Sequence, residues 1–373
     1  MQNNENSIEY YLYQKHIDYI WSFETKKFRN RYPELFNEQF VLFCKDEIIP
    51  AFRNAKNKYV KYSLYDLEKK NWFLAILTGI VMIGSLLLDV FLLIYLFGIF
   101  KNILIQILLI LLITVITAFS WLIISIPYSN SILLKYKKQW TNVKKEIFPI
   151  IFSQIPNCKY LTEYSLGYKM LQYLKNTKLI KERKLVNFSF EEDRFQIEYN
   201  GHLIDIGEYC FGGFDKYDYP LARFKNQTYA GSGYGLFVRM KIETKIKGKT
   251  VILRKLFKRD NLANTKESII LENDEFNKIF SVIASSQLEA RKVLTPKFMQ
   301  FLIDFSEEYP NNEFDVSIEN GYFNFVFIKM GEYESFEFKP SKLHNWNDII
   351  RDSRAMLIEI KEILRIIDAF EIE

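Results

Sequence analysis

Two apolar runs organise the chain: WFLAILTGIVMIGSLLLDVFLLIYLF at residues 72–97 and ILIQILLILLITVITAFSWLIISI at residues 103–126. A helix needs roughly 20 apolar residues to cross a hydrocarbon core about 30 Å thick, and both runs reach that length. Lipid offers the backbone no hydrogen-bond partner, so each run is expected to be a helix. Because only residues 98–102 separate them, we predict an antiparallel transmembrane hairpin over residues 71–127.

Lysines flank this hairpin on both sides, whereas its turn holds only Lys101. The positive-inside rule therefore predicts that both termini are cytoplasmic and that the turn is outside. We expect a multi-pass protein of the inner (cytoplasmic) membrane, whose first partner is the lipid bilayer. The flanking lysines are Lys56, Lys58, Lys61, Lys69 and Lys70 before the hairpin, and Lys135, Lys137, Lys138, Lys144 and Lys145 after it.

The overall charge argues against a nucleic-acid partner. The chain has 373 residues, with 50 basic and 45 acidic side chains and a net charge of +5, which is too balanced for a typical nucleic-acid-binding protein. The three cysteines, Cys44, Cys158 and Cys210, lie far apart. Their spacing fits neither a disulfide framework nor a metal site, so we expect a reducing compartment, no metal and no cofactor.

The regions around the hairpin differ in periodicity. Residues 1–70 show helical spacing of aromatic side chains and predict an amphipathic cytoplasmic stalk. Its apolar face is expected to pack on the chain's own C-terminal domain or, as a coiled coil, on a helix of another subunit. Residues 128–184 predict a juxtamembrane helical region that includes a helix ending at Pro156. Residues 185–373 predict an α+β domain, an antiparallel sheet with helices on one face.

Within the C-terminal domain, turn and cap residues set the predicted elements. Asn200-Gly201 and Asn320-Gly321 are two-residue hairpin signals. Lys247-Gly248 is expected to join a strand at 234–243 to a strand at 249–256, and residues 290–294 resemble a strand. Thr295 and Pro296 suit the N-cap and first residue of a helix over 296–308. An apolar stripe of Leu357, Ile360, Leu364 and Ile367 predicts a last helix over 346–370.

Several short stretches of this domain carry a family resemblance. They are Gly235-Leu236-Phe237, the run from Lys247 through Gly248 to Leu253, Leu271-Glu272, Glu275-Phe276, and the run Gln287-Leu288-Glu289-Ala290-Arg291-Lys292-Val293-Leu294-Thr295-Pro296. The region around residues 130–370 resembles the bacterial domain-of-unknown-function family 3137, integral membrane proteins with a cytoplasmic C-terminal domain. The resemblance implies location and domain boundaries, and it implies no catalytic residue. As a strand, residues 288–293 would place Glu289 and Arg291 on one side, where they could pair.

Two candidate functional features stand apart from that block. Asp89 is a carboxylate inside the first span, where charged residues are costly and commonly functional. Helix pairing or an oligomer contact is the first interpretation, and ion or proton conduction is the second. A long loop at 209–233 gathers aromatic residues, which suits a binding loop or a loop packed on its own sheet. These residues are Tyr209, Phe211, Phe214, Tyr217, Tyr219 and Tyr229.

No Gly-x-Ser-x-Gly, Walker-type or His-Glu-x-x-His motif occurs in the sequence. We therefore expect a non-enzymatic protein: a membrane-tethered interaction or scaffold module, for which assembly into a homo-oligomer is one option. The alternative is a sensor or a channel or transport subunit that uses Asp89. A third interpretation, an enzyme of another kind, requires a deep polar pocket in residues 185–370.

Overall fold

The computed structural model describes residues 26–60, 83–84, 87, 90–91, 94–95, 139–161, 191–211, 233–242, 248–255, 268–310, 312–330, 336 and 346–370. The chain divides into two compact units. The first unit combines Met1–Ala51, Ile147–Phe338 and Leu343–Glu373, and the second combines Phe52–Glu146 with Lys339–Lys342. Described residues 26–51, before the predicted hairpin, therefore share a unit with the C-terminal helices, whereas residues 52–60 belong to the second unit.

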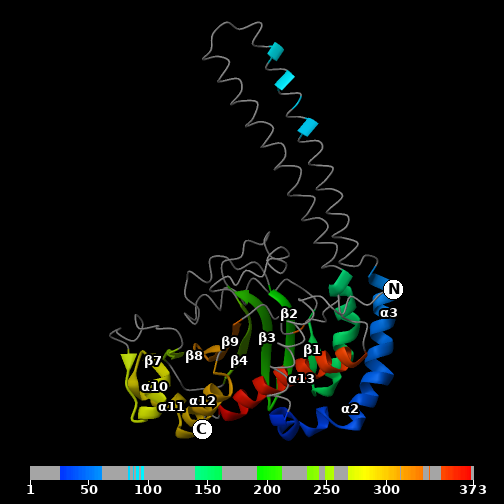
Figure 1. Ribbon diagram of the computed structural model, residues 1–373. Helices are drawn as coiled ribbons and strands as arrows, with labels where there is room; N and C mark the ends of the chain where they lie inside the picture. Colours follow the sequence, from blue (N-terminus) through cyan, green and yellow to red (C-terminus); the bar gives the residue numbers. More distant parts are fainter. Residues whose placement is uncertain are drawn as a thin grey trace. The chain divides into compact units, whose positions relative to one another are not determined.

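An antiparallel sheet forms the centre of the first unit (Figure 1). In the described part of the chain it has nine strands in the order β1-β2-β3-β4-β9-β8-β5-β7-β6. All neighbouring strands are antiparallel. The strands are β1 (Cys158–Tyr160), β2 (Glu191–Tyr199), β3 (His202–Phe211), β4 (Gly233–Lys241), β5 (Thr250–Arg254), β6 (Ser268–Ile269), β7 (Phe280–Ala284), β8 (Glu313–Glu319) and β9 (Tyr322–Met330).

Both predicted Asn-Gly hairpins are confirmed. They connect β2 to β3 and β8 to β9. Asn200 and Gly201 have φ values of 50° and 76°, and Asn320 and Gly321 have values of 54° and 75°. Two successive residues with positive φ are what a type I′ turn requires, and Asn and Gly adopt this conformation most readily.

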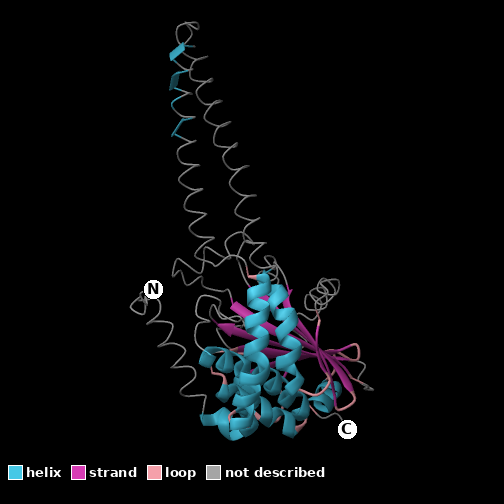
Figure 2. Cartoon of the chain, turned by 90° about the vertical axis from the view of Figure 1, so that its right-hand side faces the viewer, coloured by secondary structure: helices cyan, strands magenta, loops and turns pink. Residues whose placement is uncertain are grey.

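Helices of the first unit lie along one face of the sheet (Figure 2). The C-terminal ones are α10 (Asp274–Ile279), α11 (Gln287–Val293), α12 (Pro296–Glu308) and α13 (Trp346–Ala369). The N-terminal part contains helical residues 26–31, η1 (Pro33–Leu35), α2 (Glu38–Phe43), the π-helical η2 (Cys44–Ile48) and α3 (Ile49–Tyr59). Residues 139–151 form a further helix, followed by η3 (Phe152–Gln154). The structure is thus α+β, as predicted.

Aromatic side chains join α12 and α13 to the sheet. Phe305 of α12 lies 5.0 Å from Phe314 of β8 and 6.3 Å from Phe325 of β9, between ring centroids. Phe370, which follows α13, lies 4.4 Å from Phe323 of β9. The predicted stripe of α13 is buried throughout: Leu357, Ile360, Leu364 and Ile367. Burial of such large side chains is worth about 1.5–3 kcal/mol each, so this layer holds the first unit together.

Polar groups complete both ends of α12. At its start, Thr295 Oγ1 accepts a hydrogen bond from the Phe298 amide at 3.2 Å, and Pro296 occupies the first turn, which confirms the predicted cap. At its end, the Arg254 guanidinium of β5 donates to the carbonyls of Ser306 and Tyr309 at 2.7 and 2.6 Å. A buried cation suits the carbonyl end of a helix because those groups carry partial negative charge.

Two predictions about the sheet are wrong. β4 and β5 are not neighbours, since β4 pairs with β3 and β9, whereas β5 pairs with β7 and β8. The ladder between β4 and β9 runs from Tyr234 to Lys241. A local turn signal such as Lys247-Gly248 cannot predict that β4 pairs instead with β9, a strand of the distant β8–β9 hairpin. Gly248 has another role, because a Cβ there would collide with Ser285 Oγ.

Residues 290–294 do not form the predicted strand, because Gln287–Val293 is helix α11. Ala290 and Val293 are buried three residues apart, which is the spacing of one helix face. The expected pairing of Glu289 with Arg291 is also wrong. Glu289 pairs with Lys292, one turn along the helix, at 2.9 Å, and Arg291 pairs with Glu272.

Few residues of the predicted hairpin belong to the described part. Ile83, Gly84, Leu87, Val90, Phe91, Ile94 and Tyr95 are helical. Within the described residues, no helix has the length and apolar character needed to cross a membrane. The flanks lie together in the second unit: Lys58 of α3 pairs with Glu146 of the 139–151 helix at 2.7 Å, and Phe52 lies 6.3 Å from Trp140.

Candidate functional site

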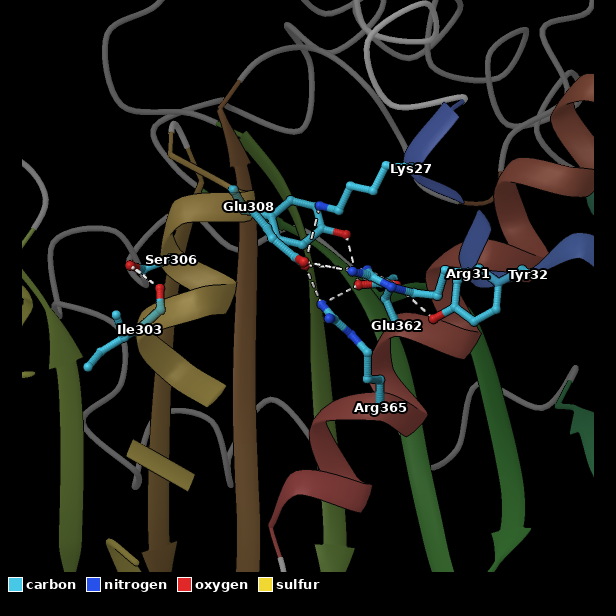
Figure 3. Close-up of polar contacts among 9 residues, drawn as sticks. Lys27, Arg31, Tyr32, Ile303, Ser306, Glu308, Glu362 and Arg365 are labelled. Carbon is cyan, nitrogen blue, oxygen red and sulfur yellow. Dashed lines mark hydrogen bonds and ion pairs between the residues drawn. The ribbon is translucent and has the colours of Figure 1, made fainter. Parts of the chain in front are cut away.

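Charged and hydroxyl groups from distant segments meet at the end of α12 (Figure 3). We call this the Glu308–Glu362 cluster. Its carboxylates are Glu308, the last residue of α12, and Glu362, in the middle of α13. Its donors come from both ends of the chain: Lys27, Arg31, Tyr32, Tyr309 and Arg365.

Glu362 is 6% exposed and accepts from four groups. Its Oε1 accepts from Arg31 Nη1 at 2.8 Å and from Tyr32 Oη at 2.7 Å. Its Oε2 accepts from Arg365 Nη2 at 2.7 Å and from Tyr309 Oη at 3.0 Å. A buried carboxylate is stable only when it is paired and hydrogen-bonded, and this one has two partners on each oxygen.

Glu308 binds the same two guanidinium groups and an ammonium group. Arg31 Nη2 donates to its Oε1 at 2.6 Å, Arg365 Nη2 donates to its Oε2, and Lys27 Nζ lies 3.3 Å from that oxygen. The two arginines therefore bridge both carboxylates. Arg365 also stacks near Phe301 and Phe305 of α12, at 5.2 and 5.5 Å from the ring centroids.

The cluster shifts the pKa values of its members. Burial would raise the pKa of Glu308, but hydrogen bonds from Arg31 and Arg365 outweigh burial and hold that pKa at about 2. Burial would lower the pKa of Arg31, and its bonds to Glu308 and Glu362 raise it instead. Burial and the neighbouring Glu362 both raise the pKa of Tyr32. At neutral pH the Glu308 carboxylate is therefore a charged acceptor and not a proton donor.

This arrangement holds segments together and leaves little room for acid–base chemistry. A general base must reach a substrate proton, whereas both oxygens of Glu362 are already occupied by donors. The cluster attaches the helical residues 26–31 to α12 and α13. It fixes the N-terminal segment on the C-terminal domain, which is one of the two packing modes expected for the stalk.

The next part of the N-terminal segment also packs on α13. Arg354 Nε donates to the Leu35 carbonyl at 2.8 Å, and the Arg354 guanidinium lies 4.5 Å from the Phe36 ring centroid. Leu35 and Phe40 are 2% and 3% exposed. Within residues 26–51, the apolar face is therefore covered by the same chain.

A cavity of about 510 Å³ lies beside the cluster in the first unit. Four segments line it: residues 31–32, the turn at 154–157, the β2–β3 hairpin at 198–200, and the face of α13 from Lys361 to Asp368. Its volume is in the range of small-molecule sites, about 300–1,000 Å³. Arg31, Tyr32 and Arg365 belong to both the cavity wall and the cluster.

The described cysteines and acidic groups show no other reactive centre. Burial raises the pKa of Cys44 and of Cys158 to about 12, so both thiols stay protonated at neutral pH and are poor nucleophiles. In the part of the chain that the structure describes, no group of three or more His, Cys, Asp or Glu side chains is placed to hold a metal ion.

The sequence-predicted site residues do not meet at the cluster. Asp89 lies outside the described residues, so its role stays a prediction. Tyr209 is not a loop residue, because β3 extends to Phe211, and the Tyr209 side chain is only 1% exposed. The prediction that Tyr209 belongs to an exposed loop is therefore wrong. Phe214, Tyr217, Tyr219 and Tyr229 lie outside the described residues.

The residues that carry the family resemblance have local structural roles. Gly235 pairs with Tyr209 and Ile328 across the sheet, and Gly248 allows β5 to approach Ser285. Glu289 and Arg291 make the surface pairs of α11 already described. Thr295 and Pro296 start α12, and Gln287 starts α11. These roles position the helices that carry the cluster.

Sequence reasoning missed the cluster. The available signal was weak, because Glu362 and Arg365 are two of four charged residues among the otherwise apolar residues 356–367, together with Glu359 and Lys361. A helix that is apolar on nearly all sides is buried, and a charge within it needs a partner. The sequence does not reveal that Arg31 is that partner.

The fold defines an α+β domain that combines an N-terminal helical segment with a C-terminal sheet and helices. Residues 234–372 match the family model described as Protein of unknown function (DUF3137), which confirms the predicted family for this part of the chain. That match includes β4 and every element after it, and so contains Glu308, Glu362 and Arg365. The searches of curated proteins and of solved structures found no match.

Proposed function

We propose that this protein is a membrane-anchored interaction module. The hairpin at 71–127 is its anchor, and the first unit is its cytoplasmic binding domain. The observation that carries the anchor is that six large apolar side chains on described helical residues between 83 and 95 are exposed. Large apolar side chains that remain exposed together indicate an interaction with a membrane or another protein.

The large side chains that the structure describes in this run are all exposed. Their exposed fractions run from 51% at Val90 to 76% at Phe91. They lie inside an apolar run long enough to span a bilayer, so hydrocarbon is the partner that fits them. The residues are Ile83, Leu87, Val90, Phe91, Ile94 and Tyr95.

Contacts between the two flanks of the hairpin support the placement of both termini on the same side of the membrane. Tyr59 Oη donates to Glu146 Oε1 at 2.6 Å, next to the pair between Lys58 and Glu146. Residues just before and just after the hairpin are therefore neighbours. A chain that leaves and returns at the same place suits two antiparallel spans, and the flanking lysines favour the cytoplasmic side.

The binding role rests on the first unit. Its cavity is bordered by polar groups from four segments, whereas the carboxylates of the adjacent cluster are saturated with donors. Such a site suits recognition better than proton transfer. A scaffold role through self-association is part of the same proposal, because the anchor keeps copies in one plane.

Membrane fractionation and cysteine labelling test the anchor and its topology. We expect the protein to stay in the pellet after alkaline carbonate extraction. In a background with the natural cysteines replaced by serine, Asn102→Cys should react with an impermeant maleimide in intact cells. Glu373→Cys should react only after permeabilisation. Release by carbonate, or labelling of Glu373→Cys in intact cells, would overturn the proposal.

Analytical ultracentrifugation in detergent tests the interaction role. Because the proposal includes self-association, we expect a dimer or higher oligomer whose population rises with protein concentration. The matched control is Leu288→Glu, which changes an exposed apolar residue of α11. A strictly monomeric protein that also fails to bind any ligand in the cavity would contradict the interaction module.

A further inference from the structure

The cavity beside the Glu308–Glu362 cluster has two differently charged ends. All its lining residues belong to the first unit, so the site does not depend on the anchor. It extends the proposed function by indicating the class of ligand. The charges that line it are Arg31, Lys361 and Arg365 on one side, and Glu198 and Asp368 on the other.

The first end presents three cationic side chains to the cavity, whereas the carboxylates that pair with them are not among the lining residues. Arg31 and Arg365 share Glu308 and Glu362, with Lys27 also bound to Glu308. Lys361 pairs with Glu34 at 2.8 Å. The three lining cations are therefore backed by three carboxylates outside the cavity wall, and Lys27, which also does not line the cavity, adds a fourth cation to these pairs.

The second end keeps its negative charge. Among the described residues, only neutral groups contact the Asp368 carboxylate: Tyr199 Oη at 2.8 Å and Asn200 Nδ2 at 3.2 Å. Glu198, one residue before Tyr199, forms no ion pair with a described residue. The last turn of α13 carries Asp368 and no basic residue, so the negative end of the helix dipole adds to this potential.

The spacing along α13 sets the distance between the ends. Lys361, Leu364, Arg365 and Asp368 follow one helix face. At 1.5 Å per residue, Asp368 lies about 4.5 Å along the axis from Arg365 and about 10 Å from Lys361. Arg365 pairs with the two glutamates and not with Asp368, although Arg365 and Asp368 are one turn apart. Leu364, Ile155 and Pro156 supply apolar wall between the charges.

We propose that this cavity binds a short peptide of two or three residues with free termini. Its carboxylate lies at the end formed by Arg31, Lys361 and Arg365. Its α-ammonium lies against Glu198 and Asp368, with the middle side chain on Leu364. An extended chain spans at most about 3.3–3.6 Å per residue, so two or three residues match the distance between the ends.

Calorimetry with the full-length protein in detergent tests the ligand class. The probe is the tripeptide Ala-Leu-Ala with free termini. The controls are the same peptide with an acetylated N-terminus, with an amidated C-terminus, or with both, because each cap removes one terminal charge. We expect each single cap to weaken binding about tenfold or more, as loss of a charged hydrogen bond does. Failure of the free peptide to bind at millimolar concentration, or equal binding of capped and free forms, would overturn the proposal.

Variants at each end assign the termini. Asp368→Asn combined with Glu198→Gln should weaken the free peptide about tenfold and leave the N-acetylated peptide unchanged. Lys361→Met should weaken the free peptide and leave the amidated peptide unchanged. Glu275→Gln, an exposed change on α10, is the matched control. Equal weakening of every peptide by the cavity variants would contradict the assignment, and circular dichroism shows that each variant is folded. The anchor proposal is tested separately by membrane fractionation, so the two can fail independently.

Discussion

Residues 26–51 and residues 83–95 both carry large apolar side chains on helices, yet they bury them very differently. Leu35 and Phe40 are 2% and 3% exposed, whereas Leu87 and Phe91 are 66% and 76% exposed. The first segment has Arg31 and Tyr32, which bind carboxylates of α12 and α13. The difference teaches that apolar spacing alone does not identify the covering surface. Polar partners at the edge of the apolar face determine which surface covers that face.

Removing the Glu362 carboxylate, which lies at the centre of the cluster, should have the largest effect on the free energy of unfolding. Glu362→Ala leaves Arg31 and Arg365 without one of their two acceptors in a mostly buried site. Loss of one member of a buried pair costs about 3–5 kcal/mol, so we expect a loss of about 4 kcal/mol in the free energy of unfolding. Urea denaturation measures it, with Glu275→Ala as control. A loss below about 1 kcal/mol would show that the cluster does not hold the N-terminal segment.

Truncating a buried aromatic of the first segment is the next test. Phe40→Ala should lower the free energy of unfolding by about 3 kcal/mol, because the lost burial leaves a cavity. Limited proteolysis should then cut near residue 40 faster than in the wild type. Unchanged proteolysis together with unchanged stability would mean that α2 does not depend on its packing.

Acid should weaken the contact between the N-terminal segment and α12. The pKa of Glu308 falls from 4.5 to about 2 on folding, so its charged form stabilises the folded state. That stabilisation is complete above about pH 5 and is lost as the pH falls toward 2. It amounts to about 3 kcal/mol. Unfolding free energies measured across this range should fall more steeply for the wild type than for Glu308→Gln, and parallel curves would contradict the assignment.

A conservative change at the bridging cation should have a smaller effect. Arg31→Lys keeps the charge but cannot donate to Glu308 and Glu362 in the same fork geometry. We expect a loss of about 1.5 kcal/mol, the size of one hydrogen bond to a charged group. Thermal unfolding measures it, and Arg31→Met should cost more. Equal effects of lysine and methionine would contradict this prediction, because they would mean that the positive charge at residue 31 contributes nothing without the fork geometry.

The matched change in the exposed segment should have the smallest effect. Phe91→Ala removes a side chain that packs on little of the chain, so the free energy of unfolding of the first unit should change by less than about 0.5 kcal/mol. The same denaturation experiment as for Phe40→Ala measures it. A loss comparable to that of Phe40→Ala would mean that residues 83–95 pack on protein after all.

Much of the local structure could be predicted because it depends on residues close in sequence. Asn200-Gly201 and Asn320-Gly321 form the expected turns, and Thr295-Pro296 starts α12 where predicted. Residues 290–294 were harder, because a short apolar run fits a strand or one face of a helix equally well. The pairing of β4 with β9 lies beyond local signals, since it joins segments separated by the whole of β5 to β8.

By itself, the sequence determined the apolar runs, the two Asn-Gly hairpins, the caps and the family of the C-terminal region, because turns, caps and periodicity are properties of neighbouring residues. Only the tertiary structure decided the strand order, the surface on which the apolar face of residues 26–51 packs, and the Glu308–Glu362 cluster with its cavity. Arg31 is 277 residues from Glu308 and 331 from Glu362. Contacts over such separations arise when whole elements pack, and no local pattern encodes which buried carboxylate a given cation will reach.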